Sequence, residues 1–173
     1  KIRVVIEGAE FADYFWPAVE QYVECTHEYW RSNGQFVPNV TLRLASGGYI
    51  GGGLYHSQNL EGALATLPGV RIVCPSFADD AAGLLRTSIR SRGFTLFIEP
   101  KSLYNSVEAA TIVPDDFEVP FGKARIRREG SDLSLITYGN TTHFCLNVAE
   151  RLEKEGGWSV EVIDIRSLIP PEI

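Results

Sequence analysis

The chain has 173 residues, of which 45% are hydrophobic and 22% are charged, and its net charge is −6. This composition is typical of a soluble globular protein, and the acidic balance argues against binding to nucleic acid or to an anionic membrane. No apolar run approaches the ~20 residues of a membrane helix, and the start of the chain has no signal-peptide pattern. The three cysteines are far apart and lack metal-ligand spacing, so we expect buried free thiols.

The first predicted elements are a strand, a helix and a second strand. Residues 2–6 are almost continuously apolar, as in strands that are buried on both faces. Residues 16–30 predict a helix with Pro17 in its first turn, where the missing N–H costs little. A strand is then predicted over 40–44. Because the chain has no methionine and opens directly on a strand, we expect it to be a piece of a longer protein.

A glycine-rich segment follows this second strand. Residues 47–53 hold five glycines and lead to His56, and a helix is predicted over 58–67. A glycine-rich loop between a strand and a helix is where an open α/β sheet binds its ligand. Glycine also lets the backbone approach a ligand closely. The glycines alone would fit a plain surface loop, but the histidine at the end of the loop favours a functional site.

The next segments repeat the strand and helix pattern. A strand is predicted over 70–74, a helix runs from an Asp79 or Asp80 cap to about Arg90, and another strand covers 94–98. Repeated strand–helix–strand units of this length predict an α/β fold, with a parallel twisted sheet covered by helices on both faces.

The pattern stops after residue 100. Residues 101–122 show no periodicity, and the basic stretch 123–129 fits a solvated linker or an edge strand better than a phosphate site in an acidic chain. A strand over 133–137, a helix to about 155 capped by Thr141 or Thr142, and a strand over 159–165 predict the start of a second α/β domain. The predicted division is therefore a first domain over 1–105, a linker over 106–130 and a second domain over 131–173.

Several short segments, in order, resemble one family. The set is Glu10–Tyr14, Arg31–Gly34, Leu54–Gln58, Pro68–Pro75, Asp80–Leu85, Glu99–Tyr104 and Val119–Arg125. Together they resemble the beta subunit, or the beta half of a fused chain, of the decarboxylating component of 2-oxo-acid dehydrogenase complexes. These proteins are transketolase-like thiamine diphosphate enzymes. The Leu54–Gln58 segment is more similar to branched-chain (2-oxoisovalerate) members than to pyruvate members.

The resemblance implies a cofactor, a reaction and partners. It implies a pyrimidine-binding domain that holds the aminopyrimidine ring of thiamine diphosphate, while an alpha subunit or alpha half holds the pyrophosphate and Mg²⁺. The family oxidatively decarboxylates a 2-oxo acid and passes the acyl group to a lipoyl-bearing acyltransferase. The implied assembly is α2β2 or a dimer of fused chains, in the bacterial cytoplasm or the mitochondrial matrix.

The resemblance also assigns roles to individual residues. His56 matches the active-site histidine of the family, which donates or relays a proton near neutral pH; a packing histidine is the alternative. Tyr14 matches an aromatic residue that packs on the aminopyrimidine ring, with a core aromatic as the competing interpretation. Glu10 and Tyr55 are expected beside the cofactor and the substrate, respectively. No residue of the chain is assigned to a metal.

The chain departs from the family pattern at two places. The glutamate that activates the cofactor lies upstream of the region matched here, and Glu7 is outside the motif, so we expect this piece alone to be inactive. Ser91 and Gly93 stand where many members bind a monovalent cation with an Asp and an Asn, which weakens the case for a cation site. His27 and His143 fall in predicted helices and are interpreted as structural.

Three interpretations remain open from the sequence. The first is the dehydrogenase component, of branched-chain or pyruvate type. The second is another transketolase-like enzyme, such as a transketolase or a deoxyxylulose-phosphate synthase, which the segments Tyr55–Gln58 and Pro100–Tyr104 disfavour. The third is a degenerate, non-catalytic assembly subunit, against which the presence of His56 argues.

Overall fold

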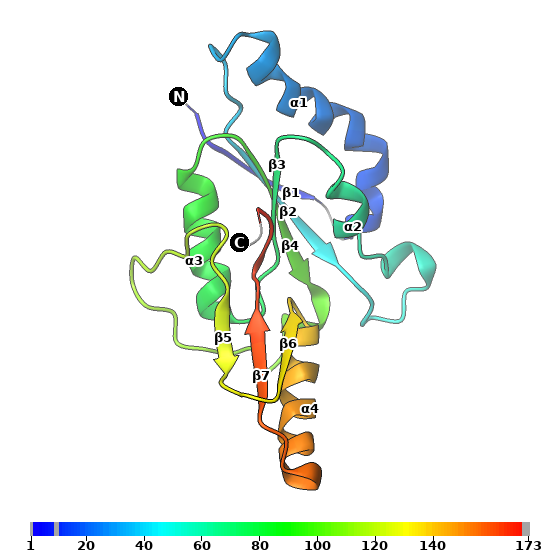
Figure 1. Ribbon diagram of the computed structural model, residues 1–173. Coiled ribbons are helices and arrows are strands. Elements are labelled where there is room, and N and C mark those ends of the chain that lie inside the picture. Colours follow the sequence, from blue (N-terminus) through cyan, green and yellow to red (C-terminus); the bar gives the residue numbers. More distant parts are fainter. Residues whose placement is uncertain (1, 9–10, 171–173) are drawn as a thin grey trace.

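Two sheets build the protein, as seen in a computed structural model that describes residues 2–8 and 11–170 (Figure 1). The larger sheet has the order β1-β2-β4-β3-β8, with β1 (Val4–Gly8), β2 (Val40–Ser46), β3 (Val70–Val73), β4 (Phe94–Pro100) and β8 (Ser167–Ile169). Its first four strands are parallel, and β8 runs antiparallel to β3. The smaller sheet has the order β5-β7-β6, with β5 (Arg125–Arg128), β6 (Leu133–Thr137) and β7 (Val160–Asp164). The predicted α/β class is confirmed.

Helices cover both faces of the larger sheet. The α-helices are α1 (Val19–Arg31), α2 (Glu61–Leu64), α3 (Ala78–Arg90) and α4 (Thr141–Gly156), and the short 3₁₀ helices are η1 (Ala12–Ala18), η2 (Leu54–His56) and η3 (Lys101–Leu103). Figure 1 shows α1 and α2 on one side of the larger sheet and α3 on the other, while α4 lies against the smaller sheet. No helix within the described residues is long and apolar enough to cross a membrane.

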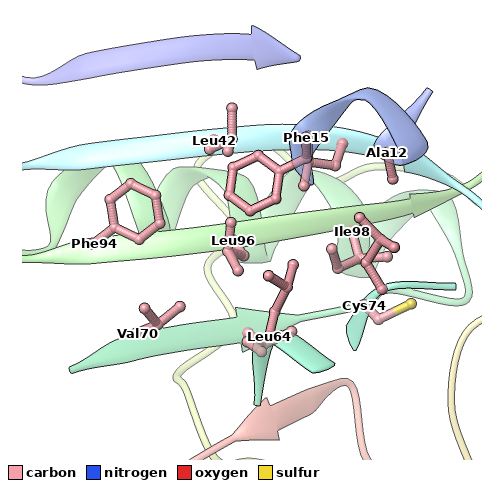
Figure 2. Packing of buried hydrophobic residues seen from close by; sticks show 12 residues of the cluster. Ala12, Phe15, Leu42, Leu64, Val70, Cys74, Phe94, Leu96 and Ile98 are labelled. Atoms are coloured by element: carbon pink, nitrogen blue, oxygen red, sulfur yellow. The ribbon is translucent and has the colours of Figure 1, made fainter. Parts of the chain in front are cut away.

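The alternation of side chains along the strands explains the two layers of core. On β4, Leu96 belongs to the cluster beneath η1, α1 and α2, whereas Phe97 belongs to the cluster beneath α3. Figure 2 shows Leu96 between Leu42 and Leu64, with Phe15 of η1 above the sheet. Burial of both faces explains why β3 and β4 read as nearly continuous apolar runs. The same expectation for residues 2–6 is wrong, because β1 is an edge strand and its Val4 and Val5 are exposed.

The helix predicted over 16–30 begins later than expected. Residues Ala12–Ala18 form the 3₁₀ helix η1, with Pro17 inside it, and α1 begins only at Val19. Proline lacks an N–H and its ring clashes with the carbonyl four residues earlier, and it also disfavours α geometry at Trp16. Pro17 therefore lies before the α-helix and not in its first turn.

The helix predicted over 58–67 is a single turn, α2. At its start, the Gln58 carbonyl accepts hydrogen bonds from Gly47 N and Ser46 Oγ, which holds Gln58 in the loop. At its end, Pro68 disfavours helical geometry at Leu67. Both constraints come from the residues that flank the turn.

The predicted helix caps are also different. The residue before α3 is Phe77, which makes no side-chain cap, and Asp79 and Asp80 lie inside the first turn. Asn140 precedes α4, again without a side-chain cap, so neither Thr141 nor Thr142 caps that helix. Gly-Gly does end α4 as predicted, because Gly157 adopts a left-handed conformation with φ of 68°.

The basic stretch forms the edge strand β5, but it is not simply solvated. Arg127 donates to Asp80 and, at 2.8 Å, to Asp164 of β7. Arg166 donates to Asp80 at 2.9 Å. Both carboxylates are fully buried, and the Arg127 and Arg166 side chains are only 7% and 8% exposed. Burial raises the pKa of Asp164, and Arg127 opposes that rise. These charges, which we call the Asp80 network, join α3 to the smaller sheet.

Strand β8 has no counterpart in the sequence prediction. After β7 the chain returns to the larger sheet, where Ile169 pairs with Ile72 of β3. A three-residue strand is too short to show a period of two. The domain boundaries stay a prediction, although β5, inside the predicted linker, hydrogen-bonds to β7.

We expect Asp80→Asn to lower the free energy of unfolding by about 3–5 kcal/mol, because it leaves two buried guanidinium groups without their shared carboxylate. Urea unfolding of the whole protein measures this. Glu155→Gln removes the exposed pair with Arg151 and is the control, with no measurable change expected. A loss as small as that of the control would show that the Asp80 network is dispensable.

Candidate active site at the carboxyl edge of the larger sheet

The four parallel strands of the larger sheet end at one edge, and three of the segments that follow them meet there. The segment after β1 supplies Phe11 and Tyr14, the loop after β2 supplies His56, and η3 after β4 supplies Lys101. Ring contacts and hydrogen bonds connect all four side chains or their backbones. This edge is where open parallel sheets bind ligands.

Glycines shape the loop that carries His56. Gly51 and Gly53 have φ of 72° and 78°, which side-chain-bearing residues rarely adopt. A Cβ at Gly52 would lie 2.6 Å from His56 Cδ2. The loop therefore needs glycine both for its turn and for close packing of its backbone against the imidazole.

The contacts of His56 define which ring nitrogen is open. Nδ1 lies 2.8 Å from the carbonyl oxygen of Tyr55, which can only accept, so Nδ1 carries the proton. The Tyr14 hydroxyl lies 3.4 Å from the same nitrogen. In the part of the chain that the structure describes, Nε2 has no hydrogen-bond partner. Nε2 is therefore the atom of His56 that can exchange a proton with a ligand.

Two aromatic rings of the β1–η1 region surround the imidazole. Phe11 stacks on His56, with centroids 4.3 Å apart and an angle of 23° between the rings. Tyr14 meets His56 edge-on at 5.6 Å and Phe11 at 5.9 Å. Tyr14 is 49% exposed, so its ring retains a free surface at this edge of the sheet.

Polar contacts tie the histidine loop to η1. Asp13 Oδ1 accepts a hydrogen bond from Gln58 N at 3.2 Å, and Trp16 Nε1 donates to Gln58 Oε1 at 3.0 Å. Asp13 is buried, and its other oxygen has no partner in the described part of the chain. These bonds fix the loop two residues after His56.

Lys101 is the buried cation of this cluster. Its ammonium donates to the His56 carbonyl oxygen at 2.6 Å and lies 4.3 Å from the centre of the Phe11 ring. Burial lowers the pKa of Lys101, and Asp13 acts in the opposite direction.

The structure brings together two of the four predicted site residues through their side chains. His56 and Tyr14 are in contact, whereas the Tyr55 side chain is 74% exposed and only its carbonyl reaches His56. Glu10 lies outside the described residues. Sequence reasoning missed Phe11 and Lys101, although both lie in segments that carried the resemblance, and Lys101 directly follows a buried strand.

A second feature of this edge is a cavity between the two sheets. It has a volume of about 170 Å³ and is lined by polar groups that include Glu61 and Tyr138 and by the thiol of Cys74. The Tyr138 hydroxyl donates to Glu61 at 3.4 Å, and burial raises the pKa of Tyr138. Burial also raises the pKa of Cys74. Across the described residues, no group of three or more His, Cys, Asp or Glu side chains could hold a metal ion.

Two family models match most of the chain. Residues 3–107 match the family model of the transketolase pyrimidine-binding domain, and residues 122–171 match that of the transketolase C-terminal domain. The beta subunit of 2-oxoisovalerate dehydrogenase from Bacillus subtilis is 42% identical over 166 residues, which are 95% of this chain and 50% of the relative. The mitochondrial protein of the same name from Dictyostelium discoideum is 40% identical over 97% of this chain and 46% of the relative.

A pyruvate dehydrogenase relative and two solved structures extend the comparison. The E1 component beta subunit from Staphylococcus aureus is 41% identical over 143 residues, or 83% of this chain and 43% of the relative. A transketolase from Leishmania mexicana has a TM-score of 0.69 at 16% identity and covers 97% of this chain and 23% of its own. A split-gene transketolase, described as an inactive beta4 tetramer, has a TM-score of 0.67 at 19% identity. The match covers 96% of this chain and 50% of the transketolase chain.

The chain spans about half the length of the curated relatives it matches. The two family models together cover most of its length, and the structural matches show the same fold. The chain therefore belongs to the transketolase-like family, as a pyrimidine-binding domain followed by the beginning of a transketolase C-terminal domain.

Proposed function

We propose that this chain is part of the decarboxylating component of a 2-oxo-acid dehydrogenase, in which His56 is the acid–base residue. The observation that carries the proposal is the open Nε2 of His56 at the carboxyl edge of the sheet. The relatives of about 40% identity support the reaction class, since they are named as 2-oxoisovalerate and pyruvate dehydrogenase beta subunits.

The geometry of His56 suits proton transfer. With Nδ1–H held by the Tyr55 carbonyl, a neutral imidazole presents a lone pair at Nε2, and a protonated one presents a donor. Histidine is the side chain that most often acts as a general acid or base in catalysis. His56 could then donate to the substrate oxygen or move a proton to the sulfur of a lipoyl group.

Whether thiamine diphosphate fits this edge depends on which aromatic ring is free to pack on it. The Phe11 ring is already packed against the His56 imidazole and the Lys101 ammonium, so it has less surface to offer. Tyr14 is half exposed, so its ring could pack on the aminopyrimidine ring. Bound thiamine diphosphate would supply the nucleophilic carbon and the electron sink for decarboxylation. Mg²⁺ and the pyrophosphate are assigned to the alpha part.

The proposed substrate is a branched-chain 2-oxo acid. The 2-oxoisovalerate relatives align over 95–97% of this chain, compared with 83% for the pyruvate relative. Pyruvate is the second candidate, because the identity of that relative is nearly the same.

The proposed partners are an alpha subunit or alpha half and a lipoyl-bearing acyltransferase. Large apolar side chains beside the site are exposed, among them Trp16, Tyr49, Leu54 and Tyr55. Aromatic residues are enriched in protein interfaces, so this surface supports a contact with the alpha part.

We expect His56→Ala to reduce turnover by about two to four orders of magnitude, as removal of a general acid–base group does. The assay uses the whole protein with its alpha part, an artificial electron acceptor, and 3-methyl-2-oxobutanoate, pyruvate and 2-oxoglutarate in parallel. The preferred oxo acid identifies the substrate.

His27→Ala is the control for this loss, because His27 lies on α1, away from the site, and should leave turnover unchanged. If none of the three acids turns over, and thiamine diphosphate does not stabilise the assembly, the chain is a non-catalytic subunit.

We expect Tyr14→Leu to weaken binding of thiamine diphosphate by about 0.5–1.5 kcal/mol, or roughly 2- to 13-fold, through the loss of ring packing. Tyr14→Phe keeps the ring and should bind nearly as well as the wild type. Calorimetric titration of the assembled protein with the cofactor measures both. Equal affinity for all three proteins would mean that Tyr14 is a packing residue only.

We propose that a guanidinium, and not a monovalent cation, holds the turn after α3. Arg71 of β3 donates to the Arg92 carbonyl at 2.6 Å and to Thr95 Oγ1 at 3.1 Å. A Cβ at Gly93 would lie 3.5 Å from Arg71 Nη2. Arg71 therefore fills the space beside Ser91 and Gly93, where the family resemblance would place a cation.

We expect Arg71→Met to destabilise the protein by about 0.5–1.5 kcal/mol, because the exposed Arg92 carbonyl exchanges its hydrogen bond with Arg71 for one with water. Replacing potassium with choline in the buffer should leave the thermal midpoint of the wild type unchanged. A rise of that midpoint on titration with potassium alone would instead reveal a cation site.

A further inference from the structure

Lys101 is unusual because it is buried and has no ion pair with any described residue. The residue is 5% exposed, and lysines are almost never buried this far unless they are paired. Within the described residues, no carboxylate lies in ion-pair distance of its ammonium. Its contacts are the His56 carbonyl at 2.6 Å and the face of the Phe11 ring at 4.3 Å. The desolvated charge is therefore held by the residue that bears the acid–base group and by the ring beside it.

These two contacts restrain His56 from different directions. The hydrogen bond to the carbonyl fixes the backbone of His56, while Phe11, held under the ammonium, stacks on the imidazole with centroids 4.3 Å apart. Close packing of Gly52 against Cδ2 leaves little room for the ring to turn. If the ring turned, the hydrogen bond from Nδ1 to the Tyr55 carbonyl would break, and Nε2 would no longer be the open nitrogen.

We propose that Lys101 is a positioning residue for His56, which fixes its backbone and the Phe11 ring so that Nε2 faces the reacting atoms. This role rests on the proposed function of His56. Its effect passes through His56, because both of its contacts are with His56 or with the ring stacked on the imidazole.

The test compares three substitutions of Lys101 in the whole protein with its alpha part. Lys101→Met keeps the length of the side chain but removes the charge and the donor. Lys101→Gln removes the charge and keeps a donor that can reach the His56 carbonyl. Lys101→Arg keeps both. Lys154→Met on α4 is the control, because that lysine is exposed and lies in the smaller sheet's layer.

The main measurement is chemical labelling of the histidines, which does not require the protein to turn over a substrate. The rate at which diethyl pyrocarbonate modifies each histidine is measured by peptide mass spectrometry, with His27 as an internal reference. We expect Lys101→Met to raise the rate at His56, because the imidazole loses its restraint against Phe11, and Lys101→Gln to raise it less. Lys101→Arg and Lys154→Met should leave the rate unchanged. If Lys101→Met does not assemble, Lys101→Gln carries the same prediction.

The second readout separates positioning from binding. If the protein is active, Lys101→Met should lower kcat by about 10- to 100-fold, as small misplacements of catalytic groups do, with little change in the KM for thiamine diphosphate. Lys101→Gln should recover part of that loss. An unchanged labelling rate of His56 in both uncharged variants would overturn the proposal, whether or not the protein turns over any oxo acid. If the wild-type protein turns over none of the oxo acids, the proposed function is contradicted. The labelling result would still test the role of Lys101.

Discussion

The parallel alignment of β1, β2, β3 and β4 is the constraint on which the candidate site depends. It places the ends of these strands at one edge, so segments separated by 45 residues, such as those carrying His56 and Lys101, come into hydrogen-bond contact. The same alignment buries both faces of the sheet beneath helices. Burial of apolar side chains therefore stabilises the sheet, and the loops at the carboxyl ends of its strands can carry glycines and polar residues.

The sequence predicted the order and type of the main elements, because the strands are short apolar runs and the long helices α3 and α4 repeat apolar residues with the helical period. The sequence prediction failed where a local constraint sets the boundary of a helix, or where a distant partner decides whether a strand forms. Pro17 moves the start of α1, and hydrogen bonds at Gln58 reduce the next helix to one turn. The short strand β8 exists only because β3 offers it an edge, and three residues contain no periodic signal.

The residues of the candidate site also divide into those that the sequence predicts and those that depend on partners from distant segments. His56 could be predicted because it follows a glycine-rich loop between a strand and a helix and matches the active-site histidine of the family, and Tyr14 followed from the same resemblance. The burial of Lys101 could not be predicted, since lysine is normally a surface residue and its partners are a carbonyl and a ring from other segments. The Asp80 network was missed for a related reason: a basic stretch in an acidic chain reads as solvated until its buried carboxylates are in place.

The return of the chain as β8 restricts how the two sheets can move. The polypeptide crosses from the larger sheet to the smaller one after β4 and crosses back before Ser167, so two covalent connections span the junction. A rotation that separates the two sheets would have to bend both connections, break the pairing of β8 with β3 and break the ion pair of Arg166 with Asp80. The return of the chain therefore adds a second covalent restraint on such a motion.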